Sequence, residues 1–576
     1  MQERKKTIIV NTLLTILFIT GEVILEVLIP NITSGMVNGI KDGVPLETTL
    51  STGGQMAIAA VVSLLCGSLA GNFAAKASAN LAGALRHDIF RKVQSFSFSN
   101  IDKFSTSSLV TRMTTDITNV QNSYMMLIRT AIRSPFMLVF TIVMAFRMSA
   151  ELATAFVIVV PVMAFGLIMI GKFAMPAFRA VFKKYDRMNE SIEENVRGMR
   201  VVKGFAREQY ETEKFTKASD GIRREFTKAE RIVSLNGPLI ELCMYFDTAF
   251  ILYVGAQIVI GSKGQDIDVG QISAMLTYGA MILMSLMMIS MIYVMLTMSL
   301  ESVKRIREVL KEEPSITNPE NPVMEVIDGS IEFRDVAFKY SENASRDALF
   351  DIDLHIDSGM TVGILGGTGS SKTTLIQLIP RLYDVTDGEL KVGGINVKKY
   401  DVKTLRDAVS VVLQKNELFS GTIRDNLKWG NENASDDEII AACKIAQADE
   451  FISQMPEGYD TYIEQGGTNV SGGQKQRLCI ARALLKKPKI LILDDSTSAV
   501  DTRTDALIRK GFREYIPETT KIIIAQRVAS VMDCDMIVIM DNGKIADKGT
   551  HTELMERCDI YREIYEEQTK GDDGND

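Results

Sequence analysis

Hydrophobic residues are concentrated in the first half of the chain, in six apolar runs. The runs cover residues 8–30, 56–75, 125–146, 152–173, 238–260 and 272–300. A helix needs about 20 predominantly apolar residues to cross a bilayer. The alternative of buried helices in a soluble protein does not suit so many runs of this length, and no small-residue cleavage site follows the first run, as it does in a signal peptide. The pattern therefore predicts six membrane-spanning helices.

Two long connections between these runs are polar yet keep helical spacing of their apolar residues. They extend over residues 76–124 and 172–236, and the second contains Ile192, Val196 and Met199 on one helical face. A helix rises about 1.5 Å per residue, so such segments reach tens of ångströms beyond the bilayer. We expect the membrane helices to continue into the cytoplasm as far as a second domain.

Basic residues are unevenly distributed between the two sides of the predicted spans. The segments after the first, third and fifth spans hold only Lys41, Arg147 and Lys263. Cytoplasmic segments carry the excess of Lys and Arg, which places both termini and the two long connections in the cytoplasm. The basic residues on that side include Arg4, Lys5, Lys6, Arg86, Arg91, Lys92, Lys183, Lys184, Arg197, Arg200, Lys203 and Arg207.

The pattern changes after residue 312. Pro314, Pro319 and Pro322 interrupt any helix and mark a linker over residues 313–325. Alternating strands at 329–340 and strand-then-helix units then follow, which predicts an α/β domain at 326–568 and a polar tail at 569–576. The expected architecture is an α-helical membrane domain over residues 1–312, with two cytoplasmic coupling loops, followed by an α/β P-loop nucleotide-binding domain.

A glycine-rich segment follows the predicted strand at 361–365 and opens a helix. It fits the phosphate-binding pattern G-x-x-x-x-G-K-[ST], except that Ser371 replaces the last glycine. Backbone N–H groups of the segment are expected to bind phosphate, with Lys372 at the β- and γ-phosphates and Thr373 on Mg²⁺. By itself the pattern also fits a glycine-rich turn without a ligand. The expected nucleotide-binding residues here are Gly366, Gly367, Thr368, Gly369, Ser370, Ser371, Lys372, Thr373 and Thr374.

Two further motifs accompany the phosphate loop. An apolar strand at 490–493 ends in Asp494 and Asp495, which suits a carboxylate that holds Mg²⁺ through water. The sequence VSGGQ lies just before it, at 470–474. Together these motifs resemble a half-transporter of the ATP-binding cassette (ABC) exporter family, with VSGGQ at the place of the LSGGQ signature.

The resemblance covers nearly the whole chain and implies roles for particular residues. Tyr340 matches the aromatic residue that stacks on adenine, and Gln414 matches the glutamine that senses Mg²⁺, while Asp494 matches the carboxylate that holds it. Residues 498–501 match the loop that contacts the other subunit, and 549–554 match the closing G-T-H-x-E-L. Residues 111–116 and 194–205 resemble the coupling loops. The signature residues expected to act on ATP bound by a partner are Ser471, Gly472, Gly473 and Gln474.

Two catalytic positions depart from the family. Asp495 replaces a glutamate that polarises the attacking water and is one methylene shorter, although a general base needs hydrogen-bond reach of about 2.6–3.2 Å. Gln526 replaces the switch histidine, and glutamine cannot become a cation. The paired losses resemble the degenerate subunit of a heterodimeric multidrug exporter, which implies weak ATP hydrolysis at this site and a different partner chain with an intact glutamate and histidine. The alternatives are a homodimeric exporter or lipid flippase with a slow ATPase, and a membrane regulator that uses ATP binding as a signal.

The sequence contains fewer features that indicate the transported compound than features that indicate the ATP site. Methionines recur at helical spacing in the last span, which suits a flexible apolar cavity for drugs, lipids or peptides or, equally, packing against neighbouring helices. Ionisable residues inside spans usually face the bundle interior or water, and they favour a cationic amphiphile as substrate. The cavity candidates are Glu22, Glu26, Asp247, Met284, Met288, Met291 and Met295.

Composition narrows the choice of partners and compartment. The net charge of −8 argues against nucleic acid, which demands a basic face. The six cysteines share no metal-binding spacing, which indicates reduced structural thiols. The chain resembles multi-pass transporters of a prokaryotic plasma membrane in three features. These are the absence of a targeting presequence, the single fused cassette and the small outer loops. The expected ligands are therefore ATP, Mg²⁺, the lipid bilayer and a small hydrophobic substrate.

Overall fold

The chain folds into two compact units. The computed structural model describes residues 2–262, 265–341, 344, 346–495 and 500–572. The first unit comprises Met1–Gln94 and Ser105–Glu312, and the second comprises Ser95–Phe104 and Glu313–Asp576. The short segment Ser95–Phe104, which the sequence assigned to the membrane domain, thus packs with the second unit.

Among its described residues, the first unit contains six helical stretches that are long and apolar enough to cross a membrane, which confirms the predicted count. Its two longest helices have 49 and 48 residues, or roughly 70 Å at about 1.5 Å per residue, against about 30 Å for the apolar core of a bilayer. The elements are α1 (Gln2–Lys41), α2 (Leu46–Gln94), α4 (Thr106–Thr111), the π-helical η1 (Arg112–Asp116), α5 (Ile117–Met148), α6 (Ala150–Arg197), α7 (Met199–Gly204), α8 (Glu208–Val233), α9 (Asn236–Ser262) and α10 (Val269–Lys311).

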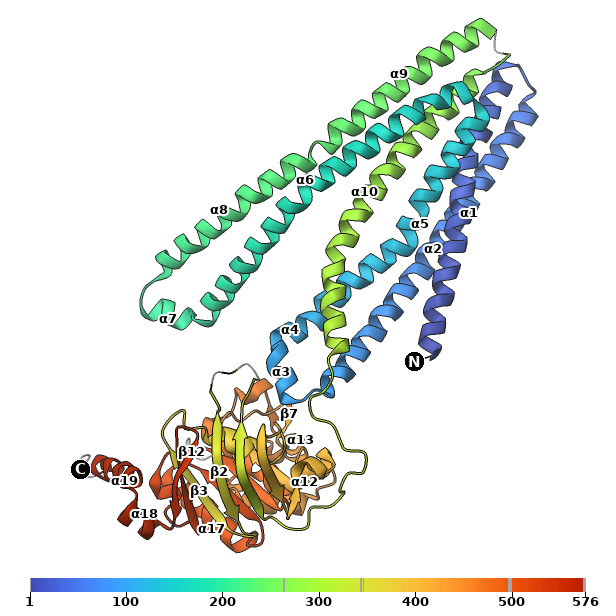
Figure 1. Ribbon diagram of the computed structural model, residues 1–576. Coiled ribbons are helices and arrows are strands. Elements are labelled where there is room, and N and C mark those ends of the chain that lie inside the picture. Colours follow the sequence, from blue (N-terminus) through green and yellow to red (C-terminus); the bar gives the residue numbers. More distant parts are fainter. Residues whose placement is uncertain (1, 263–264, 342–343, 345, 496–499, 573–576) are drawn as a thin grey trace. The chain divides into compact units, whose positions relative to one another are not determined.

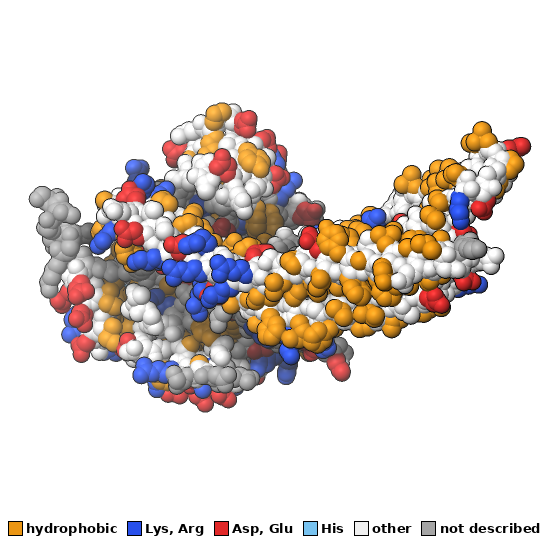
Figure 2. Space-filling view, turned by 90° about the horizontal axis from the view of Figure 1, so that it is seen from above, with side chains coloured by type: hydrophobic (Ala, Val, Ile, Leu, Met, Phe, Trp, Pro, Cys, Tyr) orange, Lys and Arg blue, Asp and Glu red, His pale blue; other side chains and the backbone are white. Residues whose placement is uncertain are grey.

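These helices pack mainly as long neighbours. α1 lies along α2, α10 along α5, and α6 beside α8 and α9 (Figure 1). Tyr278 on α10 is fully buried, and its hydroxyl donates a hydrogen bond of 2.9 Å to the carbonyl of Val27 on α1. On the face seen in Figure 2, hydrophobic side chains cover a long stretch of these helices. Leu13, Leu64 and Phe165 are mostly exposed, as expected of residues that face lipid.

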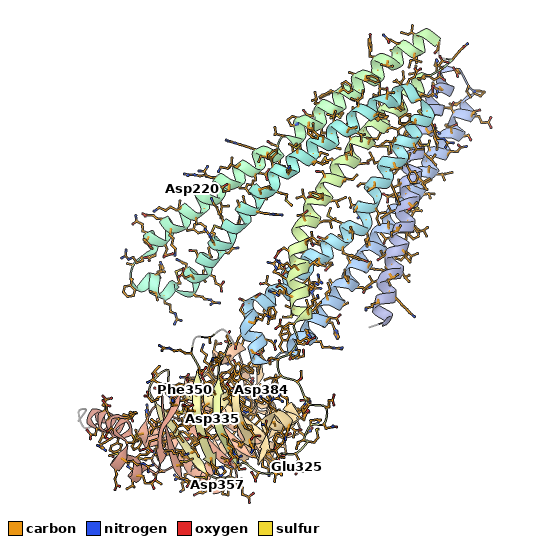
Figure 3. All side chains as sticks on the ribbon, in the orientation of Figure 1. Asp220, Glu325, Asp335, Phe350, Asp357 and Asp384 are labelled. Atoms are coloured by element: carbon orange, nitrogen blue, oxygen red, sulfur yellow. The ribbon has the colours of Figure 1, made fainter. Side chains whose placement is uncertain are left out.

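The α8 helix differs from the apolar spans because its exposed face is charged. Asp220, which projects from α8 in Figure 3, accepts a 3.1 Å hydrogen bond from Arg223. Lys203 on α7 pairs with Glu208 at the start of α8 at 2.9 Å. These pairs suit a helix surrounded by water, beyond the apolar part of the unit.

The second unit contains the α/β arrangement that the sequence predicted. A four-stranded antiparallel sheet has the order β2-β1-β4-β5, a six-stranded sheet has the order β12-β11-β3-β10-β9-β6, and β7 pairs with β8. The strands are β1 (Ile331–Phe338), β2 (Leu349–Ile356), β3 (Thr361–Gly366), β4 (Asp387–Val392), β5 (Ile395–Asn396), β6 (Val409–Val412), β7 (Gly421–Thr422), β8 (Tyr462–Ile463), β9 (Ile490–Asp494), β10 (Thr520–Ile524), β11 (Met536–Asp541) and β12 (Lys544–Gly549).

The six-stranded sheet is parallel through its centre. In register, Ile524 at the end of β10 lies opposite Ile364 on β3 and Asp494 on β9. Both faces of these strands are covered, so most of their side chains are apolar and buried. The carboxyl ends of β3, β10, β9 and β6 therefore meet at one edge, where ligands bind in open α/β sheets.

Helices complete the second unit. Ser97–Phe104 lies against Tyr383, because the Tyr383 hydroxyl donates a 2.7 Å hydrogen bond to Asp102 and its ring lies 6.0 Å from that of Phe98. The helices are α3 (Phe98–Phe104), α11 (Lys372–Leu378), α12 (Val402–Ala408), α13 (Ile423–Lys428), α14 (Asp436–Ile445), α15 (Asp449–Ser453), α16 (Gly472–Leu485), α17 (Thr502–Tyr515), α18 (His551–Arg557) and α19 (Asp559–Asp572).

The six cysteines are free, and five of them are buried. Burial raises the pKa of Cys443 and of Cys534 to about 12, so both thiols stay protonated at neutral pH. This agrees with the interpretation of these residues as structural thiols.

Candidate functional site

The phosphate loop leaves β3 through a glycine that no other residue can replace without a shift. A Cβ on Gly366 would lie 2.2 Å from the carbonyl oxygen of Met540 on the neighbouring strand. Gly369 has a φ of +86°, in the region that favours glycine. The loop thus turns sharply at the end of the strand and presents its backbone at the start of α11.

Ser371, the departure from the loop pattern, adopts the left-handed conformation that glycine favours. Its φ and ψ are 71° and 25°, and its side chain makes no capping hydrogen bond to α11. A residue with a Cβ is strained here by about 1–2 kcal/mol. The backbone of the loop therefore keeps the shape that a glycine would give it, at a cost in stability.

Lys372 is folded over its own loop. Its ammonium donates hydrogen bonds to the carbonyls of Gly366 at 2.8 Å and Gly367 at 2.9 Å, and to the hydroxyl of Ser370 at 3.3 Å. Burial lowers the pKa of Lys372, opposed by the nearby carboxylates of Asp494 and Asp495. A cation is thus held within the loop, where a phosphate group would lie.

Thr373 and Asp494 form a hydroxyl and carboxylate pair beside this loop. The Thr373 hydroxyl donates to the Asp494 carboxylate at 3.0 Å. Burial is the main cause that raises the pKa of Asp494, and the charge of Asp495 adds to it. Hydroxyl and carboxylate oxygens are the ligands that Mg²⁺ prefers, so these two residues fit a magnesium ion bound with a nucleotide.

Asp495 is held by two glutamines. One of its carboxylate oxygens accepts hydrogen bonds from the side-chain amides of Gln526 at 2.8 Å and Gln414 at 3.3 Å. Its side chain is 8% exposed, and its φ is 49°, a left-handed conformation. Burial raises the pKa of Asp495, while the two amides lower it. The structure thus brings together Gln414, Asp495 and Gln526, which follow β6, β9 and β10.

A residue that the sequence analysis missed fixes the loop after β10. The side-chain amide of Gln568 on α19 donates to the carbonyl of Gln526 at 2.8 Å, and its oxygen accepts from the N–H of Val528 at 2.8 Å. Gln568 therefore joins α19 to the backbone on both sides of Arg527, in the loop that begins with Gln526. It lies in a polar helix near the end of the chain, and no local pattern marks it.

Tyr340, which the resemblance matches to the adenine-stacking residue, lies beside the phosphate loop. It is half exposed, and its hydroxyl hydrogen-bonds with Thr374 at 2.9 Å. Its ring contacts those of Phe338 and Tyr383 edge-on, with centroids 4.9 Å and 5.3 Å apart. Asp384, which is labelled in Figure 3 and follows Tyr383 in the chain, pairs with Arg381 at 2.7 Å. An aromatic surface is thus rigidly attached to the phosphate loop.

The signature forms the exposed beginning of α16. The hydroxyl of Ser471 accepts from the N–H of Gln474, and the Gln474 side chain accepts from the N–H of Ser471 at 2.9 Å. Ser471 and Gly472 are exposed, and Gly473 is half-buried. The free N–H groups of a helix start bind anions. The predicted intersubunit loop at 498–501 lies partly outside the described residues, which begin again at Val500.

The two predicted cytoplasmic connections differ in the structural unit to which their parts belong. Residues 111–116, taken from the sequence as a coupling-loop tip, form the end of α4 and η1 within the membrane unit. The segment that packs with the nucleotide-binding unit is earlier, at Ser95–Phe104. In the second connection, Val201 on α7 and Phe205, directly after α7, are exposed.

The predicted cavity residues do not all lie together in the membrane unit. Glu22 and Glu26 both pair with Arg133 on α5, at 3.2 Å and 2.6 Å, and the sequence analysis had not included Arg133. Asp247 is instead buried between α9 and α10, since a Cβ on Gly279 would lie 2.0 Å from its carboxylate. Glu26, Met284 and Met288 line a cavity of about 390 Å³, whereas Met291 is exposed and Met295 is half-buried outside its lining.

Comparisons with known proteins agree with the division of the chain into a membrane domain and an ATP-binding domain. A family model described as the ABC transporter transmembrane region matches residues 8–287, and one described as ABC transporter matches residues 349–498. YfiB of Bacillus subtilis (strain 168), named an uncharacterized ABC transporter ATP-binding protein, is 37% identical over 508 residues, which cover 88% of this chain and 87% of YfiB. The similarly named Rv1273c of Mycobacterium tuberculosis (strain ATCC 25618 / H37Rv) is 32% identical over 94% of this chain and 93% of its own length.

A solved structure of a bacterial Atm1-family ABC exporter with ATP bound has the same fold. It superposes with a TM-score of 0.82 over 98% of both chains, at 24% sequence identity. This similarity is one of fold, while the relatives of higher identity carry the assignment to a family. The chain belongs to the ABC transporter family, as a half-transporter in which one membrane domain precedes one ATP-binding domain.

Proposed function

We propose that this chain is the degenerate-site subunit of a heterodimeric exporter of hydrophobic or amphipathic compounds. It binds ATP and Mg²⁺, hydrolyses ATP slowly at its own site, and supplies its signature to a competent site on a different half-transporter. The observation that carries this proposal concerns Asp495. Its side chain is one methylene shorter than the glutamate of the family, and its carboxylate accepts hydrogen bonds from the side-chain amides of Gln526 and Gln414.

The residues of the site have separate tasks. Lys372 and the loop N–H groups bind the phosphates, and Thr373 and Asp494 hold the metal ion. When bound, Mg²⁺·ATP supplies the phosphoanhydride and a divalent charge that neutralises it. Asp495 must orient a water and accept its proton, and a carboxylate drawn towards two amides has less reach for that task. Gln526 donates a hydrogen bond but adds no positive charge as negative charge develops.

The membrane and partner follow from the same proposal. The excess of basic residues on one side of the spans supports an orientation with both termini in the cytoplasm. The candidate spans and the bacterial relatives support a multi-pass protein of a prokaryotic plasma membrane. The partner would carry the glutamate and the histidine that this chain lacks, and would place them opposite Ser471 and the N–H groups of Gly472 and Gly473.

The test is ATP turnover by the chain purified alone and together with the half-transporter that co-purifies with it. We expect turnover well below the usual enzyme range of about 1–10³ s⁻¹ for the chain alone, and turnover within it for the pair. Asp495→Asn should change the rate of the pair little, whereas replacing the partner's catalytic glutamate should abolish it. Ser471→Ala in this chain should also lower the rate of the pair, because the signature acts on the partner's ATP.

The competing function is a homodimeric exporter or flippase with a slow ATPase. It is favoured by one observation, because burial raises the pKa of Asp495 and so makes it a better proton acceptor. If the chain alone hydrolyses ATP within the usual range and Asp495→Asn abolishes that activity, the aspartate is sufficient as the base and the heterodimer proposal fails.

A further inference from the structure

Three aromatic rings beside the phosphate loop form a closed group. The centroid of the Tyr340 ring lies 4.9 Å from that of Phe338 and 5.3 Å from that of Tyr383, and the Phe338 and Tyr383 centroids lie 5.5 Å apart. Phe338 is buried, whereas Tyr340 is half exposed. Edge-on and tilted ring contacts at these distances are favourable. Tyr340 therefore exposes part of its ring to a base, while two neighbouring rings hold it in place.

Tyr383 connects this group of rings to α3. Its hydroxyl donates a 2.7 Å hydrogen bond to Asp102, and its ring lies 6.0 Å from that of Phe98. Burial and the hydrogen bond to Asp102 raise the pKa of Tyr383, so its hydroxyl stays protonated and remains the donor at neutral pH. One side chain thus contacts both the residue expected to stack on adenine and a helix of the first cytoplasmic connection.

The backbone around Tyr383 is fixed by contacts outside this group. Arg381 pairs with Asp384 at 2.7 Å. Arg406 donates hydrogen bonds to the carbonyl of Pro380 at 3.3 Å and to that of Arg381 at 2.9 Å. Because the backbone is held, the Tyr383 side chain responds to its neighbours by turning about its own bonds. The orientation of its ring is therefore the property that a bound base can change.

α3 is also hydrogen-bonded to the linker that follows α10. The side-chain amide of Asn100 donates to the carbonyl of Glu313 at 3.0 Å, and its oxygen accepts from the N–H of Ser315 at 3.2 Å. Asn100 is buried. The chain passes from one unit to the other at 104–105 and at 312–313. The two segments of the nucleotide-binding unit that adjoin these crossings are therefore joined to each other.

We propose that Tyr383 is a positioning residue that links adenine binding to the stability of α3. A base stacked on Tyr340 fixes the orientation of that ring, the edge-on contact then restricts Tyr383, and the Tyr383 hydroxyl stays on Asp102. The link needs no closure of two subunits, because the three rings and α3 all belong to one chain. The proposal deepens the proposed function by naming a regulation of its ATP site, and it rests on ATP binding there with the adenine on Tyr340.

The test is hydrogen exchange of the amides of residues 101–104 in the full chain in lipid nanodiscs. It compares saturating Mg²⁺·ATP with saturating magnesium tripolyphosphate, which has the phosphates but no adenine. We expect ATP to slow exchange by about three- to tenfold relative to tripolyphosphate, the range that one hydrogen bond supplies. Tyr383→Phe keeps the ring and removes the donor, so the two ligands should then slow exchange equally. Tyr515→Phe, at the exposed tyrosine that ends α17, is the matched control and should leave the difference unchanged.

Affinity measurements distinguish this link from a merely structural role. Coupling between two sites is reciprocal, so Tyr383→Phe should weaken ATP binding by no more than the factor by which ATP protects α3, and should leave the affinity for tripolyphosphate unchanged. If the variant only loosens α3, exchange rises by the same factor with ATP, with tripolyphosphate and without nucleotide, and the proposal fails.

The remaining outcomes separate this proposal from the proposed function. The link is wrong if ATP binds to the unchanged chain yet protects α3 no more than tripolyphosphate does, and the degenerate ATP site then still stands. If ATP does not bind at all, both proposals fail. Brisk ATP hydrolysis by the chain alone contradicts the degenerate site only, because the link depends on adenine binding and not on the rate of hydrolysis.

Discussion

At the scale of single residues, Ser371 stands where the phosphate-loop pattern has a glycine. It keeps the left-handed backbone conformation of that position at a cost in stability. Ser371→Gly should remove about 1–2 kcal/mol of left-handed strain, while the added freedom of glycine in the unfolded chain returns about 0.4–1 kcal/mol. We therefore expect the change to stabilise the nucleotide-binding unit by roughly 0.5–1 kcal/mol. The measurement is the urea midpoint followed by fluorescence of Trp429, the one tryptophan of the chain, which lies in this unit.

Thr368→Gly is the matched control for this change. Thr368 belongs to the same loop and is exposed, but its φ is not among the positive values. It has no left-handed strain to lose, so only the entropic loss remains and the midpoint should fall. Equal shifts in the two variants would contradict the strain at Ser371.

Asp494 makes the stability of the same unit depend on pH. Its pKa is raised in the folded protein, chiefly by burial, so the folded state disfavours the ionised carboxylate. The stability of the folded state is therefore greatest below the pKa of about 3.9 that the carboxyl has in the unfolded chain. It falls as the pH rises through the higher pKa of the folded state, and the full cost of burying the charge is present once the carboxyl is ionised. Asp494→Asn should raise the urea midpoint of the nucleotide-free chain at pH 7.5 more than at a pH of about 4, close to the pKa of the carboxyl in the unfolded chain. A midpoint lowered equally at both values would show that the carboxylate stabilises the empty site.

At the scale of elements, local patterns predicted the strands and spans but not their partners. The strand expected at 361–365 matches β3 (Thr361–Gly366), and the apolar strand before Asp494 matches β9, because buried parallel strands are continuous apolar runs. By contrast, α3 packs with the nucleotide-binding unit through the hydrogen bond of Asp102 to Tyr383, 281 residues away. The pairing of Arg133 with Glu22 joins positions 111 residues apart. Periodicity contains no information on such contacts.

The α19 helix provides a prediction at this scale, because Gln568 joins it to the switch loop. Gln568→Ala removes the acceptor of the Val528 N–H. A lost hydrogen bond costs about 0.5–1.5 kcal/mol, so exchange of that amide with solvent should rise by up to roughly tenfold. The readout is hydrogen exchange of the full chain, with Glu567→Ala, an exposed neighbour on the same helix, as control. Unchanged exchange at Val528 would mean that the loop is held without α19.

At the scale of the whole molecule, the proposal requires that the defect lies only in the two departed catalytic positions. In the proposed site, Lys372 lies over the phosphate loop, Thr373 hydrogen-bonds to Asp494, and Ser471 caps the signature helix. The double variant Asp495→Glu, Gln526→His should therefore raise ATP turnover by the chain alone, since a longer carboxylate reaches the water and a histidine can become a cation. Either single change should restore less, because both groups act on the same transition state.

The same double variant tests whether two copies of this chain can assemble at all. Each ATP site of the family uses the phosphate loop of one subunit and the signature of the other, so restored turnover demands a dimer. Adding Ser471→Ala to the double variant should abolish the gain, which distinguishes a restored composite site from hydrolysis by single chains. If the double variant stays inactive alone but raises the turnover of the pair above that of the unchanged pair, the chain's surfaces permit only the heterodimer. If it raises turnover in neither case, the defect lies elsewhere than at Asp495 and Gln526, and the proposed origin of the degenerate site is wrong.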